Sequence, residues 1–281
     1  YFIISRSFGI NIGAAIGITL YLSQAISVAF YVIAFAEAFE AIKPWVADSF
    51  GYELYDNRLF SVPALLLLIW LMVTKGADLG MKALYVVVAI LAVSLILFFL
   101  GSTPYGEVFD NSKIFSGVTS DKSFFYVFAI IFPAFTGMTA GVGLSGDLKD
   151  PKKSIPKGTL LATAVGIIVY VAVALKLVLS ASLEDLAADQ LIMSKIAIWE
   201  PIIPIGLGCA AISSALGSMM IAPRTLQALG VDKVFPMQLS VWFAKGKGVK
   251  LEPFNAALVT SFFGFFFVDK REGLLNYSMQ L

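Results

Sequence analysis

Hydroxyls and backbone groups inside otherwise apolar stretches are the groups of this chain most able to bind a ligand. Ser213 and Ser214 are adjacent in the middle of the apolar run 201–223. Proline removes a helical hydrogen bond and glycine leaves helical dihedrals at low cost, so the run 123–146 is expected to be a broken helix. Its second half contains one proline, two threonines and four glycines: Pro133, Thr136, Gly137, Thr139, Gly141, Gly143 and Gly146. Unwound carbonyls bind cations, and the start of a second half-helix faces an anion.

Each feature also has a plainer interpretation, and the residues alone leave both open. Serine hydroxyls in a helix often bond the backbone carbonyl four residues earlier, and a proline-kinked helix with small residues is common in membranes. Tyr31 and Glu37 lie in the run that ends near Phe39. A tyrosine in a span is more often an interface anchor than a ligand. We interpret Glu37 as an end-of-helix residue, with a proton relay as the alternative.

The composition places these features in a membrane protein. The 281 residues are 59% hydrophobic and 14% charged, and the mean hydropathy is +0.87. The net charge of +1 gives no nucleic-acid-binding surface, and the single cysteine excludes a disulfide framework. The lack of histidine removes the commonest general base and zinc ligand. An enzyme, a cofactor and a bound transition metal are therefore not expected.

Stretches without charged residues predict seven spans in one transmembrane domain that covers residues 1–281. The predicted spans are approximately 10–38, 59–74, 83–102, 123–146, 158–180, 201–223 and 253–268. A cytoplasmic N-terminus puts twelve Lys and Arg residues in the inner segments and seven in the outer ones, which fits the positive-inside rule. The basic loop 244–250 (AKGKGVK) is interpreted as a topology signal that contacts lipid headgroups.

Several stretches resemble the cation-chloride cotransporters, a family within the amino acid–polyamine–organocation superfamily. The similarity covers most of the chain to about Val268, and the stretch after Phe132 is the most specific. The stretches are ISRSFG (4–9), QAISVAFYVIAFAE (24–37), FPAFTGMTAGVGLSGDLKDPKKSIPKGTL (132–160), AAISSALGSMMIAPRTLQALGVDKVFP (210–236) and WFAKGKGVKLEP (242–253).

The resemblance implies an all-α integral membrane protein with a leucine-transporter-like fold, in which two inverted repeats surround a midplane site. The seven spans then correspond to helices three to nine of ten core helices, the fourth span being discontinuous. The last residues, DKREGLLNYSMQL, depart from the family pattern. We therefore expect an incomplete chain that lacks helices one, two and ten.

The resemblance also implies three ion sites, which are assigned residue by residue from the matching positions. Because the chain has both the tyrosine and the serine pair, it resembles the sodium-potassium-chloride type. The implied ligands are Tyr31, Pro133 and Thr136 for potassium; Gly137, Met138 and Thr139 for chloride; and Ala210, Ser213 and Ser214 for sodium.

The resulting hypothesis is a secondary active transporter that performs electroneutral cotransport of chloride with sodium and/or potassium across the cell membrane. Its expected partners are the three ions and the lipid bilayer, without nucleic acid; a homodimer is neither required nor excluded. Three alternatives stay open. They are a sodium-coupled amino acid permease, a proton-coupled carrier that titrates Glu37 or Lys176, and a non-transporting truncated remnant.

Overall fold

The computed structural model describes residues 1–39, 51, 56–102, 123–132, 145, 148–189, 191–247 and 251–279. These residues form helices and one isolated β-bridge between Lys247 and Glu252, without a strand. The all-helical class is therefore confirmed for this part of the chain, whereas the inverted repeat stays a prediction. The chain divides into two compact units, Tyr1–Ile96 with Pro201–Leu281 and Leu97–Glu200.

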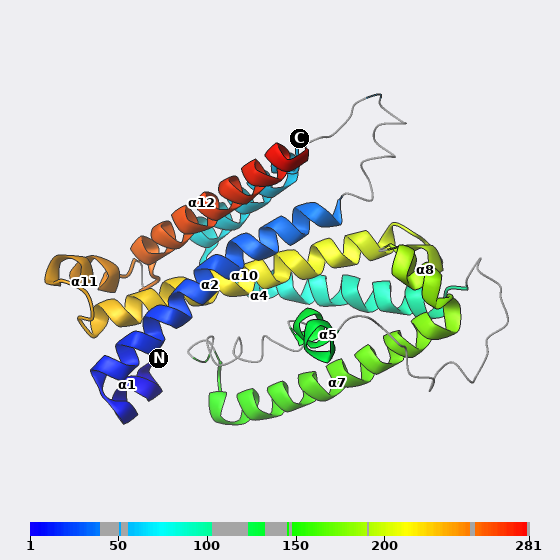
Figure 1. Ribbon diagram of the computed structural model, residues 1–281. Helices are drawn as coiled ribbons and strands as arrows, with labels where there is room; N and C mark the ends of the chain where they lie inside the picture. Colours follow the sequence, from blue (N-terminus) through cyan, green and yellow to red (C-terminus); the bar gives the residue numbers. More distant parts are fainter. Residues whose placement is uncertain are drawn as a thin grey trace. The chain divides into compact units, whose positions relative to one another are not determined.

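The described residues of the first unit form five whole helices and most of a sixth. They are α1 (Phe2–Phe8), α2 (Ile10–Ala38), α4 (Arg58–Leu100), α10 (Ile202–Val231), α11 (Met237–Ala244) and α12 (Phe254–Met279). Those of the second unit form the end of α4 and four further helices, which are α5 (Phe124–Ile131), α7 (Pro151–Ser180), α8 (Leu183–Ala188) and α9 (Ile192–Ile196) (Figure 1).

The centre of the first unit is the antiparallel packing of α2 against α10, which lie side by side in Figure 1. Near one end, a Cβ placed on Gly208 would lie 3.5 Å from the Phe35 ring; near the other, a Cβ on Gly17 would lie 2.8 Å from Leu229. Small residues let two helix backbones approach closely, and α10 buries Ala211 and Ala215 within this contact.

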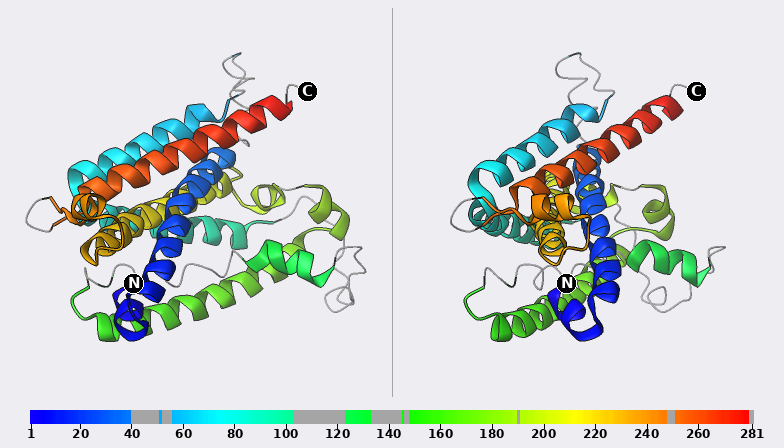
Figure 2. Two further views of the ribbon diagram at one scale, coloured as in Figure 1. Left: turned by 60° about the vertical axis from the view of Figure 1, so that its left-hand side comes forward. Right: turned by 90° about the vertical axis from the view of Figure 1, so that its left-hand side faces the viewer.

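Two more helices lie beside this pair. Helix α12 packs on α2 and α10, and it runs antiparallel to the first part of α4, as Figure 2 shows. The Gly264 position of α12 faces Leu65 of α4, while Asp269 lies 3.4 Å from the Arg58 guanidinium. The two contacts fix the register of α4 against α12.

A glycine separates the two N-terminal helices. Gly9 has a φ of +87°, which a residue with a side chain rarely adopts, and it ends α1 before α2 begins. Helix α1 then folds back on α2, because Gly13 leaves room for Ser5, whose Cβ would be 2.5 Å from a Cβ at that position.

Among the described residues, four helices are long and apolar enough to cross a membrane by length and composition, namely 10–38, 83–100, 151–180 and 202–231, with a shorter apolar helix over 58–72. Helix α2 covers the same residues as the first predicted span. The two predicted spans 59–74 and 83–102 form one 43-residue helix, α4. Its 43 residues are about twice the roughly 20 that one crossing needs. That α4 crosses twice therefore stays a prediction.

The second unit contains an apolar helix with little protein around it. In its most apolar stretch, α7 has no buried side chain. Near its C-terminus the Lys176 ammonium donates a 2.7 Å hydrogen bond to the Gly101 carbonyl just beyond α4. The amide of Ile198 donates to the Leu97 carbonyl at 3.2 Å. Helix α9, the end of α4 and Lys176 are thereby joined.

Candidate ion-binding site

Tyr31 lies seven residues before the end of α2, beside the seam with α10. Its neighbours Val28 and Val32 are fully buried, Val28 against Gly264 of α12, and Tyr31 itself is half-buried. Its ring packs edge-on against Phe30, with the centroids 5.6 Å apart. Within the described residues its hydroxyl makes no hydrogen bond.

The serine pair lies on a continuous helix, since α10 runs without a break from Ile202 to Val231. Ser213 is half-buried and Ser214 is exposed. Other hydroxyls in these helices bond the carbonyl four residues earlier, as Thr225 does to Ile221 at 3.2 Å. In the part of the chain that the structure describes, neither serine hydroxyl of the pair makes such a bond. The self-bonded alternative therefore does not hold for Ser213 and Ser214 in this structure.

The register of α2 and α10 places Tyr31 and the serine pair at the same level. Gly208 faces Phe35 and Ala38, and Ser213 lies five residues, or about 7.5 Å, further along α10. Tyr31 lies four residues before Phe35 and seven before Ala38, which is about 6–10 Å back along the antiparallel helix. Tyr31 and the serine pair thus lie within about one helical turn of each other, measured along the helix axes.

The other predicted ligands divide into two groups. Ala210 is half-buried on α10, one turn before Ser213 and Ser214, and its carbonyl belongs to a regular helix. The potassium ligands Pro133 and Thr136 and the chloride ligands Gly137, Met138 and Thr139 lie outside the described residues. Phe132, directly after α5, is the last described residue before this stretch.

The two residues considered for a proton-coupled carrier lie near helix ends. Glu37 is exposed in the last turn of α2, which agrees with the end-of-helix interpretation. Lys176 lies four residues before the end of α7 and binds the Gly101 carbonyl. A cation suits this position because the C-terminal carbonyls of α4 carry a partial negative charge.

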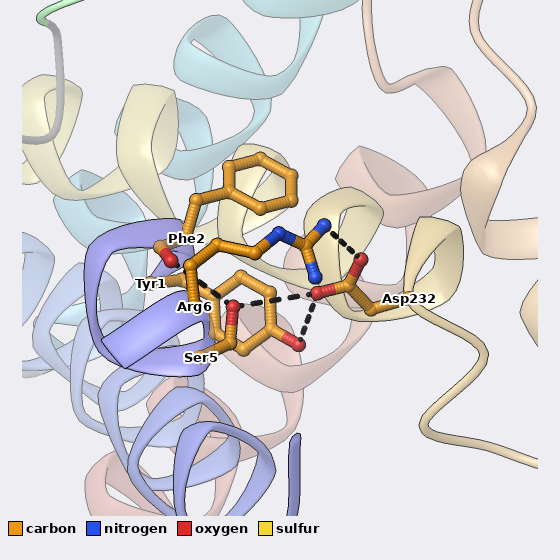
Figure 3. A network of polar contacts seen from close by, with 5 residues as sticks. All are labelled: Tyr1, Phe2, Ser5, Arg6 and Asp232. Atoms are coloured by element: carbon orange, nitrogen blue, oxygen red, sulfur yellow. Dashed lines mark hydrogen bonds and ion pairs between the residues drawn. The ribbon is translucent and has the colours of Figure 1, made fainter. Parts of the chain in front are cut away.

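A buried carboxylate that sequence reasoning missed lies at the C-terminus of α10. Asp232 accepts hydrogen bonds from the Tyr1 hydroxyl and the Arg6 guanidinium, both at 2.9 Å, and from Ser5 at 3.5 Å (Figure 3). Only 6% of its side chain is exposed. Burial, followed by the interaction with Asp232, raises the pKa of the Tyr1 hydroxyl above its usual value. Because the partners are more than 220 residues apart, no local signal could have indicated the contact.

The oxygen atoms that this site offers to a cation, those of Tyr31, Ser213 and Ser214, belong to uncharged groups. Among the described residues, no group of three or more Cys, Asp or Glu side chains is placed to hold a metal ion. Hydroxyl and carbonyl oxygens replace the hydration shell of a monovalent cation without adding a fixed charge. The arrangement of Tyr31, Ser213 and Ser214 therefore fits a monovalent cation better than a divalent one.

Long apolar helices, a glycine-lined helix seam and uncharged oxygens define a membrane protein of the transporter class. The sequence profile of the amino acid permease family matches residues 1–280. The chain belongs to the amino acid permease family.

Named relatives agree with the predicted resemblance to the cation-chloride cotransporters. The chain is 31% identical over 310 residues to solute carrier family 12 member 2 of Mus musculus, covering 92% of this chain and 25% of that protein. It is 29% identical over 324 residues to the bumetanide-sensitive sodium-(potassium)-chloride cotransporter of Manduca sexta, covering 95% and 30%. The chain thus spans about a quarter to a third of the length of these relatives.

Proposed function

We propose that this chain forms part of a secondary active transporter that couples chloride to sodium and/or potassium across the cell membrane. The observation that carries the proposal is the common level of Tyr31, Ser213 and Ser214 along the axes of the packed helices α2 and α10, with three hydroxyls that make no hydrogen bond within the described residues. The relative from Manduca sexta, whose name includes sodium, potassium and chloride, supports the same class of substrate.

Each ion has a proposed set of ligands. Ser213, Ser214 and the Ala210 carbonyl bind sodium, which is small and requires several close oxygens. Tyr31 binds potassium together with Pro133 and Thr136, and the amides of Gly137, Met138 and Thr139 face chloride. Amides at the start of a half-helix suit an anion because their hydrogens are unpaired and the helix dipole is positive there.

The orientation and the number of spans belong to the same proposal. The N-terminus is cytoplasmic, and the seven spans correspond to helices three to nine of a leucine-transporter-like fold. The antiparallel packing of α2 and α10 agrees with the number of spans, because the first and the sixth span cross in opposite directions. The orientation follows from the distribution of Lys and Arg.

A sodium-coupled amino acid permease is the second candidate, and the family to which the chain belongs favours it. Such a protein binds a carboxylate and an amine at its broken helices. The two candidates differ in substrate, so uptake measurements separate them. Neither candidate is an enzyme, and the relatives' names describe solute carriers and cotransporters.

The sodium assignment is tested by removing both serine hydroxyls in the full gene product that contains these residues. Chloride-dependent uptake of radioactive rubidium, a potassium substitute, is measured in cells at increasing sodium concentrations. We expect Ser213→Ala with Ser214→Ala to abolish the sodium dependence of uptake. The matched control is Ser261→Ala, whose buried hydroxyl bonds the Ala257 carbonyl at 2.8 Å and should leave that dependence unchanged.

Two results contradict the proposal. Wild-type sodium dependence in the double serine variant removes the sodium site from α10. Saturable uptake of an amino acid by the unmodified protein, without chloride-dependent rubidium uptake, supports the permease instead.

A further inference from the structure

The short helix α11 lies in the connection between α10 and α12. Four of its large apolar side chains are exposed. Met237, Leu239, Val241 and Trp242 are 66%, 48%, 62% and 43% exposed, respectively. Only Ser240 and Phe243 of this helix are buried. Its outer face is therefore mostly apolar and has no protein covering it within the described residues.

The position of α11 at one end of the first unit is fixed by packing. A Cβ on Gly230 of α10 would be 2.8 Å from the Ala244 amide nitrogen and from the Phe243 Cβ, so α11 contacts the α10 backbone directly. Asn255 of α12 donates a 2.8 Å hydrogen bond to the Trp242 carbonyl. Ser240 donates to the Phe235 carbonyl at 2.7 Å and accepts from its amide. Helix α11 is thus held rigidly where α10 ends and α12 begins.

In the predicted topology, the junction of α10 and α12 lies at the membrane surface. Helix α12 runs alongside α2 in the same direction, since Tyr21 packs against Phe263 and Val28 against Gly264. Because α2 and α10 are antiparallel, α10 and α12 are antiparallel as well, and α11 joins adjacent ends of the two. A helix at the ends of two spans lies at the level of the lipid headgroups, where Trp side chains are enriched.

Basic side chains surround this apolar face. Lys233 precedes α11, Lys245 and Lys247 follow it, and all three are exposed. The sequence from 233 to 247 contains no Asp or Glu. Of the carboxylates on either side of this stretch, Asp232 is engaged by Arg6 and Tyr1, and Glu252 faces Lys247 across the backbone bridge. The Lys247 ammonium lies 4.6 Å from the centroid of the Phe254 ring, above the start of α12.

We propose that α11 and Lys233, Lys245 and Lys247 form a docking surface for anionic phospholipids of the adjacent leaflet. The four apolar side chains insert at the boundary between headgroups and acyl chains, and the three ammonium groups bind the headgroup phosphates. An apolar face with flanking lysines is the chemistry that holds a helix on an anionic leaflet. The surface gives the first unit a lipid-dependent anchor, independent of which ions are transported.

The test uses the tryptophans of the chain as local reporters of lipid composition. One variant keeps only Trp242, with Phe at positions 45, 70 and 199; the matched control keeps only Trp70, which is 56% exposed on α4 within a predicted span. Each full chain is reconstituted in vesicles of equal phosphatidylcholine and phosphatidylglycerol, and either lipid carries brominated acyl chains that quench tryptophan fluorescence.

We expect brominated phosphatidylglycerol to quench Trp242 more strongly than brominated phosphatidylcholine, with an apparent local enrichment of about fivefold. Fivefold corresponds to about 1 kcal/mol, the contribution of one lysine near an anionic surface. Trp70 should be quenched equally by both lipids. Lys233→Gln with Lys245→Gln and Lys247→Gln should remove the preference at Trp242 without changing Trp70.

A second measurement needs no lysine substitution. Raising the salt concentration screens the lysines, so the preference at Trp242 should decrease in the chain with its native lysines. Equal quenching of Trp242 by both lipids at low salt overturns the proposal. Absence of quenching by either lipid also overturns it, and indicates that protein covers this face.

Discussion

The Arg6 guanidinium and the Asp232 carboxylate are 2.9 Å apart, although 226 residues separate them in the chain. Arg6 is largely exposed, with 64% of its side chain accessible, whereas Asp232 is buried. The buried carboxylate also accepts a hydrogen bond from Tyr1. The contact therefore ties the short helix before α2 to the end of α10, at the same end of the first unit as α11.

Removing the Asp232 carboxylate should weaken the attachment of α1 to the end of α10. In Asp232→Ala three donors lose their acceptor, and hydrogen bonds to a charged group contribute about 1.5–3 kcal/mol. We expect the local opening free energy of α1 to fall by about 2 kcal/mol, which makes amide hydrogen exchange over residues 2–8 about 30-fold faster. Arg6→Gln should have a smaller effect, about 0.5–1 kcal/mol, because the guanidinium is exposed.

The control for this prediction is Asp185→Ala. Asp185 lies in the first turn of α8 in the second unit and bonds Ser182 at 2.6 Å. This variant should leave exchange in α1 unchanged. Unchanged exchange in Asp232→Ala would show that α1 is held by its packing on Gly13 instead.

Gly101 should tolerate no side chain. A Cβ at this position would lie 1.9 Å from the Ile196 carbonyl oxygen, and the Gly101 carbonyl also accepts from Lys176. Gly101→Ala should therefore lower the free energy of unfolding of the second unit by about 2–3 kcal/mol. Denaturant unfolding followed by Trp199 fluorescence, in a chain with Phe at the other three tryptophans, measures it.

Gly158 provides the matched control. It lies in α7, where a Cβ meets nothing within 4 Å, so Gly158→Ala should stabilise the helix by about 0.5–1 kcal/mol. Equal effects of the two substitutions would contradict the close approach at Gly101.

Lowering the pH should destabilise the segment around α9. The hydrogen bond with Lys195, and then the Leu191 amide, hold the pKa of Asp189 below its usual value of 3.8. A lowered carboxyl pKa stabilises the fold above its unfolded value, and this contribution is lost as pH falls through the folded value. The fluorescence of Trp199 should therefore stay constant at pH 4 and change only below about 3.8.

Lys195→Gln removes the first of these interactions. The pKa of Asp189 should then move up toward its usual value, and the acid transition at Trp199 should shift to higher pH. Lys157→Gln removes the same charge from α7 and should leave the transition where it is. An unshifted transition in Lys195→Gln would exclude Asp189 as its cause.

Tyr31→Phe should weaken potassium binding selectively in the full gene product. The substitution removes one oxygen and keeps the ring that packs against Phe30. The potassium concentration for half-maximal uptake should rise several-fold, about 1 kcal/mol for one lost oxygen contact, with smaller changes for sodium and chloride. Equal losses for all three ions would assign Tyr31 a structural role.

The sequence predicts the bounds of some helices closely, but it does not predict which helices pack against each other. Helix α2 coincides with the predicted run 10–38, because Gly9 precedes its first residue and the charge-free window 7–36 accounts for most of its length. Hydropathy does not indicate which helices pack together, so the contact of Gly208 with Phe35 could be identified only in the structure. The same holds for Arg6 and Asp232, whose separation leaves no periodic pattern.

The candidate site was predictable only in part. Composition indicated an interrupted helix after Phe132 and a polar pair at Ser213, but the ligand roles depended on resemblance to a family. The structure adds the common level of Tyr31 and Ser213, which follows from helix register and not from any motif. The ligands from Pro133 to Thr139 lie outside the described residues and keep the status of predictions.

The first unit is built from two segments of the chain, Tyr1–Ile96 and Pro201–Leu281. During synthesis, α2 therefore enters the bilayer before its partner α10 exists. About 160 residues lie between the end of α2 and the start of α10, and making them takes roughly 8–30 s at a rate of about 5–20 residues per second. In that interval lipids or the insertion machinery must occupy the small-residue face of α2. A stop codon before residue 202 would leave α2 permanently unpaired, so a truncation there damages a helix that is made well before it.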